Sequence, residues 1–246
     1  MNRALKALLW RVIPDSVRRR VRPGAVPPPH HVDWGDLRST KPVSRWFGYD
    51  RGLPIDRYYI EAFLAAHARD VRGCVLEIGD DSYTRRFGGK RVSIRDILHV
   101  SADAPGATIV GDLAHADHIP ANRFDCIILT QTLHLIWDVP AAIRTLYRIL
   151  APGGVLLATV PGISPIDRGE WRDCWYWSFT PHSMTRLFAE HFPGPDVRIE
   201  HHGNVLSATA FVQGVAKEEL RAAELDVVDE AFPVTIVVRA VKPGRP

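Results

Sequence analysis

Glu77 and Gly79 end the apolar run CVLEIG at residues 74–79, and Asp80 and Asp81 follow directly. A short apolar run broken by glycine predicts a buried strand. In open parallel sheets, ligands bind where such strands have their carboxyl ends. The acidic-x-glycine turn therefore predicts a cofactor site. A usual nucleotide-binding loop would continue with further glycines, whereas this loop continues with two aspartates.

Other residues in the chain suggest different chemistry, but their spacing argues against it. His30-His31 and His201-His202 are pairs of potential metal ligands. Neighbours on a strand point to opposite faces, and no cysteine or carboxylate cluster accompanies either pair, so we predict no metal site. The motif G-x-G-x-x-G is missing, which argues against a nicotinamide-dependent dehydrogenase.

A series of short apolar runs predicts the sheet that positions the acidic turn. None of the runs alternates cleanly with polar residues, which favours burial on both faces. Strands alternating with helices imply a parallel sheet with right-handed crossovers. The crossover at residues 80–95 is short for a helix. We expect strands at 74–79, 96–100, 108–110, 125–130, 155–160, 197–201 and 234–241, and helices at 56–70 (with Asp56 as N-cap), 139–150 and 181–191.

Composition bounds the rest of the organisation. The 246 residues suit a single α/β domain, which we place at residues 54–246 with a helical insertion at about 203–231, after a basic N-terminal helix and a Pro-rich extended lead-in over residues 1–53. Residues 1–23 carry seven Lys or Arg and one Asp, so the remainder is mildly acidic and nucleic-acid binding is disfavoured. The basic start fits either an anionic membrane surface or packing against its own domain or a partner protein. Three scattered cysteines fit reduced thiols in the cytoplasm, and the basic start adds a membrane-peripheral location as an alternative.

Together these segments resemble class I S-adenosylmethionine-dependent methyltransferases of the type 11 group. The resemblance implies a Rossmann-like fold, with a mostly parallel seven-stranded sheet, an antiparallel last strand and helices on both faces. The matching pieces are VLEIG at 75–79, ATIVGDL at 107–113, FDCIILTQTLHLI at 124–136 and LAPGGVLLATVPG at 150–162. Three further pieces resemble a bacterial subgroup associated with surface-polysaccharide and glycosyltransferase gene clusters: residues 45–61, 178–188 and 202–214.

The resemblance also implies which residues bind the cofactor, S-adenosyl-L-methionine. Glycine allows close approach to the backbone, and a carboxylate can hold the amino group of the methionine part. A further aspartate and the residue after it meet the adenine ring, and the end of the fourth strand faces the methyl donor. The position that usually holds the ribose is less clear, with Asp103 as a substitute. The implied cofactor-binding residues are Glu77, Gly79, Asp80, His99, Ser101, Asp112, Leu113, Thr130 and Gln131.

Methyl transfer requires the protein to align the acceptor and exclude water, and an oxygen acceptor also needs a base. Candidate bases are His134, His182 and Asp173. The aromatic residues between Trp171 and Phe179 predict either a lid over an acceptor or a local hydrophobic cluster. We expect transfer to a small-molecule or glycan acceptor, with O-methylation of a sugar hydroxyl as the specific expectation. The alternative is a catalytically inactive scaffold that partners a glycosyltransferase, and the basic N-terminus would then make the contact.

Overall fold

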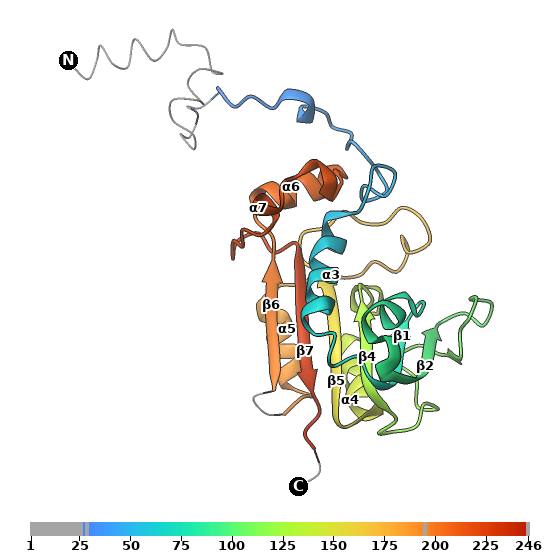
Figure 1. The fold of residues 1–246 in the computed structure, drawn as a ribbon. Helices are drawn as coiled ribbons and strands as arrows, with labels where there is room; N and C mark the ends of the chain where they lie inside the picture. The colour runs from blue at the N-terminus through green and yellow to red at the C-terminus, as the bar shows by residue number, and fades with distance from the viewer. Residues whose placement is uncertain (1–26, 28–29, 194–195, 245–246) are drawn as a thin grey trace, which may run out of the picture. The chain divides into compact units, whose positions relative to one another are not determined.

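The fold is described from a computed structural model of residues 27, 30–193 and 196–244 (Figure 1). The chain divides into two compact units, residues 1–40 and 41–246. Within the described part of the first unit, the regular structure is a single helical turn at Gly35–Leu37. The basic helix that the sequence predicts in residues 1–23 lies outside the described residues. The predicted site falls entirely within the second unit.

A seven-stranded sheet forms the centre of the second unit, in the order β3-β2-β1-β4-β5-β7-β6. β7 runs antiparallel to both its neighbours, and the neighbouring pairs from β3 to β5 are parallel. The predicted fold class is therefore confirmed. The strands are β1 Gly73–Ile78, β2 Val92–His99, β3 Ile109–Val110, β4 Phe124–Thr130, β5 Leu150–Pro161, β6 Val197–His202 and β7 Thr235–Val241.

Helices cover both faces of the sheet because successive strand residues point to opposite sides. On β4, Ile127 and Leu129 pack in the cluster that contains α4 (Val139–Ile149) and α5 (Pro181–Ala189). Cys126 and Ile128 pack on the other side against α3 (Ile55–Ala66). Figure 1 shows α3 in front of the sheet and α4 and α5 behind it.

The ends of these helices follow from local residues. Asp138 accepts a hydrogen bond from the amide of Ala141 and so caps α4, as expected of an aspartate at that position. The prediction that Asp56 caps the helix before β1 is wrong. Pro54 holds the cap position, and Asp56 is the second residue of α3 without a capping bond. Proline fits there because its fixed φ matches the φ of −55° at this position, just before the first helical residue.

The first crossover is as short as the sequence predicts. Between β1 and β2 the chain makes one helical turn at Thr84–Gly88 and another at Gly89–Arg91. β2 then begins at Val92, four residues before the predicted start. Its first residues are mostly exposed, which hides them from a search for buried apolar runs.

The segment at residues 44–54 is joined to the predicted helical insertion, which contains α6 (Val205–Gln213), a turn at Lys217–Glu219 and α7 (Ala222–Leu225). Arg51 forms an ion pair with Glu219 at 2.6 Å. The Leu53 carbonyl accepts from the Lys217 amide at 2.8 Å, and Pro54 bridges to Ala216. We call these two segments, residues 44–54 and 213–219, the roof.

Among the described residues, no helix is long and apolar enough to cross a membrane. No group of three or more histidine, cysteine or acidic residues in that part of the chain is arranged to hold a metal ion.

Candidate functional site

A cavity of about 1240 Å³ lies at the carboxyl ends of β1, β2 and β4. The roof, the start of α3 and the connection after β5 complete its wall. Pockets for one small ligand usually measure roughly 300–1,000 Å³, so this cavity has room for a cofactor together with an acceptor. The predicted cofactor-binding residues that line it are Glu77, Gly79, Asp80, His99, Asp112, Leu113, Thr130 and Gln131.

The turn after β1 is open because of Gly79. Its φ of +94° lies in the region that favours glycine. A Cβ built on Gly79 would meet no atom within 4 Å, so the glycine is needed for the backbone conformation rather than for lack of space. The turn therefore leaves open room beside the main chain, as a ligand approaching the backbone requires.

Glu77 stabilises the turn after β1 through hydrogen bonds. Its carboxylate accepts hydrogen bonds from the amides of Tyr83 at 3.1 Å and Thr84 at 2.7 Å, and its residue is only 3% exposed. Burial raises the pKa of Glu77 to about 7, although the bonds to Thr84 and Tyr83 oppose that rise. Glu77 thus joins the strand end to the short helical turn while it lines the cavity.

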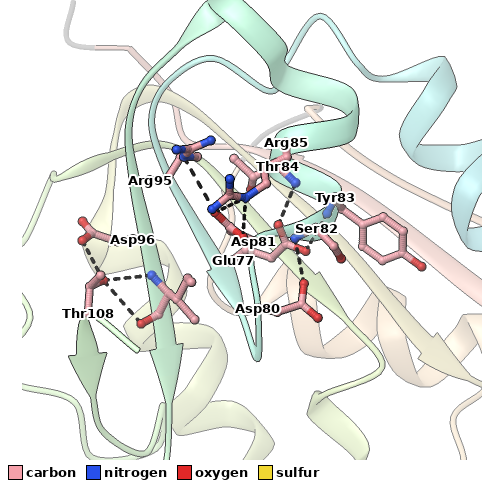
Figure 2. A network of polar contacts seen from close by, with 11 residues as sticks. Glu77, Asp80, Asp81, Ser82, Tyr83, Thr84, Arg85, Arg95, Asp96 and Thr108 are labelled. Carbon is pink, nitrogen blue, oxygen red and sulfur yellow. Dashed lines mark hydrogen bonds and ion pairs between the residues drawn. The ribbon is translucent and has the colours of Figure 1, made fainter. Parts of the chain in front are cut away.

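The two aspartates that replace the usual glycines have different surroundings (Figure 2). Asp81 bonds to Arg85 at 2.7 Å and lies 3.7 Å from Arg95, and it does not line the cavity. The hydrogen bond from Arg85 lowers the pKa of Asp81. Asp80 accepts from the Ser82 amide at 2.7 Å and does line the cavity. Only one of the two carboxylates therefore faces a ligand, and the other is neutralised by arginine.

The ends of β2 and β3 bring His99, Asp112 and Leu113 to the cavity. Ser101 does not line it: its amide donates to Nδ1 of His99, and its hydroxyl accepts from the amide of Asp103. Asp103 also lies outside the wall. Asp112 is about half exposed, accepts from the Ala114 amide at 2.9 Å and leaves Leu113 buried behind it.

Gln131, directly after β4, has a φ of +47°. Few residues other than glycine adopt this left-handed conformation, and residues that do so tend to gather at functional sites. Its amide donates to the Thr159 carbonyl at 2.9 Å, which holds the conformation in place. Nothing in the sequence around Thr130-Gln131 predicts this backbone geometry.

Of the three candidate bases, His134 lines the cavity. It is 2% exposed, and its Nδ1 has no hydrogen-bond partner among the described residues. Burial, and secondarily the charge of Arg57, lower the pKa of His134 to about 3, so the imidazole is neutral at pH 7. His182 is exposed on α5, and Asp173 is exposed and paired with Arg172 at 3.3 Å. Neither lines the cavity.

The aromatic residues after β5 divide between the two roles that the sequence left open. Trp171, Trp175 and Tyr176 line the cavity. Trp177 donates its indole N–H to the Ile136 carbonyl at 3.0 Å, and Phe179 is buried in the core. The segment thus supplies a cavity wall and anchors itself through its last two aromatic residues.

The sequence did not predict roles for several residues of the roof and α3. Phe47 stacks on Trp175 with ring centroids 6.1 Å apart, and Asp56 and Arg57 line the cavity beside Tyr49. Asp56 is 8% exposed, burial raises its pKa, and its Oδ1 has no partner among the described residues. The one available signal was the resemblance of residues 45–61 to a methyltransferase subgroup, which assigned no function to them.

Curated relatives match short parts of the chain. It is 38% identical over 104 residues to the ubiquinone/menaquinone biosynthesis C-methyltransferase UbiE of Haemophilus ducreyi, which covers 40% of this chain and 34% of that protein. For UbiE of Escherichia coli O1:K1, the identity is 34% over 77 residues, or 30% of this chain and 28% of the relative. The chain thus matches about a third of the length of these relatives.

Solved structures show the same fold at low identity. An S-adenosylmethionine-dependent methyltransferase from Archaeoglobus fulgidus has a TM-score of 0.51 and 12% identity, over 76% of this chain and 94% of the other. The [4+2]-cyclase SpnF has a TM-score of 0.51 and 18% identity, over 79% and 84% of the two chains. These structures establish the fold and leave the reaction open.

A family match covers most of the unit that contains the cavity. Residues 55–220 match the family described as a methyltransferase domain. The matched region includes the turn after β1, the ends of β2, β3 and β4, and the aromatic wall. The chain therefore belongs to the methyltransferase-domain family, and at the level of that family the predicted enzyme class and S-adenosylmethionine cofactor are confirmed.

Proposed function

We propose that this protein transfers a methyl group from S-adenosylmethionine to a hydroxyl of a sugar-containing acceptor. One observation carries the proposal: a single cavity joins the predicted cofactor residues at the strand ends to an aromatic wall. Gly79 and Asp112 are among the predicted cofactor residues in its wall, and Trp175 and Phe47, which stack on each other, line the same cavity. Aromatic faces of this kind suit the apolar faces of sugar rings.

The residues present fit the cofactor. Gly79 leaves open space beside the backbone, and Asp112 offers a carboxylate at the end of β3. Bound S-adenosylmethionine supplies an activated methyl group on a sulfonium. The protein's own contribution is to align the acceptor with that group and to exclude water. Gln131, whose left-handed conformation is held by a hydrogen bond to Thr159, also lines this cavity.

A hydroxyl acceptor must also lose its proton. Asp56 and His134 both line the cavity with an unpartnered polar atom. A general base works best when its pKa lies near the operating pH. Burial raises the pKa of Asp56 but lowers that of His134 to about 3, which favours Asp56 as the base. We propose that Asp56 accepts the proton of the acceptor hydroxyl and that His134 forms a hydrogen bond to the acceptor.

Two rival functions have specific support. The partial match to UbiE proteins favours C-methylation of a quinone-like ring, which would also stack on the aromatic wall. The shortened crossover after β1 and the altered loop at Asp80 favour an inactive scaffold that partners a glycosyltransferase. In either setting we propose that the second unit corresponds to the domain predicted at residues 54–246. Residues 1–23 would make the peripheral contact with a membrane or with that partner.

Calorimetric titration with S-adenosylmethionine and S-adenosylhomocysteine tests the cofactor directly. We expect saturable binding of both, whereas absence of heat at about 1 mM ligand would support the scaffold instead. Cell-envelope extract incubated with the enzyme and [methyl-³H]S-adenosylmethionine then tests the acceptor. Label in the polysaccharide fraction supports sugar methylation, and label in the quinone fraction supports the UbiE-like reaction.

A further inference from the structure

Arg57 is a partly buried cation in the cavity wall without an anionic partner. It is the third residue of α3 and lines the cavity. Its Nε donates to the phenol oxygen of Tyr49 at 2.9 Å. Among the residues that the structure describes, no carboxylate oxygen makes an ion pair with its guanidinium, and its side-chain partners are the phenol oxygens of Tyr49 and Tyr83.

The nearby acidic residues do not neutralise it. Glu61, one turn along α3, forms its ion pair with Arg86 at 2.7 Å. Glu77 accepts from two amides of its own turn. Asp56, adjacent in sequence, makes no ion pair with the guanidinium, and its Oδ1 has no partner among the described residues. Asp56 thus acts on Arg57 through its charge without a direct ion pair.

The surroundings of Arg57 are arranged to receive a ligand. Tyr49 accepts from the Nε of the guanidinium, and the two terminal nitrogens, which make no ion pair with a carboxylate in this part of the chain, form a fork that can bind two oxygens of an anion. Tyr83, on the turn after β1, and Asp56 both contribute to the electrostatic environment that, against the effect of burial, raises the pKa of Arg57. Figure 2 shows the Tyr83 ring directed away from the ion pairs of Asp81. His134 is close enough that the charge of Arg57 lowers the pKa of its imidazole.

Burying a charge is unfavourable unless the charge is paired. An arginine kept in a cavity wall with a free fork has the geometry for a planar, two-oxygen anion. We propose that Arg57, oriented by Tyr49, forms a carboxylate-binding subsite of the cavity. The inference rests on the proposed function for the identity of the ligands, and it names a contact that none of the predicted cofactor residues supplies.

Two ligands of the proposed reaction can present such a carboxylate. The methionine part of the cofactor carries one. Arg57 interacts with Tyr83 of the turn after β1, and this turn is where the methionine part would bind. An acidic sugar acceptor such as a uronic acid carries another. Arg57 lowers the pKa of His134, and the His134 ring contacts Trp175 of the aromatic wall, so Arg57 is also near the proposed acceptor site. Arg57 would bind either carboxylate in the same way, so the experiment must distinguish the carboxylate of the cofactor from that of the acceptor.

The test compares the wild type with Arg57→Gln and Arg57→Lys by calorimetry. The probes are S-adenosylhomocysteine, 5′-methylthioadenosine, which lacks the amino-acid carboxylate, and glucuronate titrated with and without S-adenosylhomocysteine. Arg51→Gln is the matched control, because Arg51 pairs with Glu219 and does not line the cavity. Circular dichroism and the melting temperature check that each variant is folded.

If the carboxylate is the cofactor's, Arg57→Gln weakens S-adenosylhomocysteine about 30-fold or more and leaves methylthioadenosine unchanged. Arg57→Lys recovers part of the loss. If the carboxylate is the acceptor's, S-adenosylhomocysteine is unaffected and glucuronate binding disappears in Arg57→Gln. Unchanged binding of every probe in a folded Arg57→Gln would overturn the subsite. Failure of both nucleosides to bind the wild type would instead refute the proposed function, and the glucuronate titration alone would still decide the subsite.

Discussion

Replacing Glu77 by glutamine should change how the stability of the protein depends on pH. Glu77 is 3% exposed and accepts hydrogen bonds from two amides, yet burial outweighs those bonds and raises its pKa from 4.5 to about 7. As the pH rises from about 4.5 to about 7, the unfolded chain releases this proton before the folded chain does. Stability is therefore lost across that window. The rise in pKa of about 2.5 units corresponds to about 3 kcal/mol.

Urea unfolding of the wild type and Glu77→Gln, followed by tryptophan fluorescence from pH 4.5 to 8, measures this difference. Other titrating groups are common to both proteins, so their contributions cancel in the comparison. We expect the free energy of unfolding of Glu77→Gln to gain about 3 kcal/mol relative to the wild type between the two ends of the range. A difference that stays constant, or that moves in favour of the wild type, would show that the amide bonds of Tyr83 and Thr84 outweigh burial and that the reasoning is wrong.

The remaining predictions concern the cavity wall. Asp56→Asn should lower kcat for transfer to envelope polysaccharide about 10²-fold or more while S-adenosylhomocysteine binds as before, and an unchanged kcat would remove Asp56 as the base. Trp175→Ala should fold and bind S-adenosylhomocysteine normally but lose acceptor turnover, and normal turnover would argue against an acceptor wall there. Burial lowers the pKa of His134 from 6.5 to about 3, so the buried neutral imidazole contributes stability above pH 6.5, and this contribution is lost as the pH falls toward 3. In acid unfolding, the free energy of unfolding of His134→Gln should therefore fall less steeply with pH than that of the wild type.

Most of the fold could be predicted because its core strands are nearly continuous apolar runs. Ile127–Leu129 and Leu156–Ala158 are fully buried, and both lie within predicted strands. The prediction missed the start of β2 because its first residues are mostly exposed and alternate between apolar and polar, whereas the predicted strands rest on continuous apolar runs. The helix before β1 was predicted, but its cap was assigned to Asp56 because aspartate is a common cap. The structure shows that residue buried in a ligand cavity instead.

The candidate site was predictable where it follows the strand ends, and less so elsewhere. Gly79 comes directly after β1 and Asp112 two residues after the end of β3, so the parallel order of the sheet brings them to one edge. The positions of Phe47 and Arg57 depend on how a segment before the sheet folds over it. The spacing of apolar residues in the sequence does not predict this kind of long-range contact. For the same reason the sequence could not separate His134 from His182 and Asp173, since only the tertiary fold decides which of them reaches the cavity.

The roof has a consequence for the order in which the protein folds. Arg51 and Glu219 are 168 residues apart in sequence, and nearly the whole sheet lies between them. Contacts of such long range form late, because the entropy of closing the intervening loop must first be offset by more local structure. A chain still emerging from the ribosome therefore assembles its five consecutive parallel strands before the two halves of the roof can meet. The strand edge that presents Gly79 and Asp112 exists first, and the cavity is completed only after the segment around Glu219 has been synthesised.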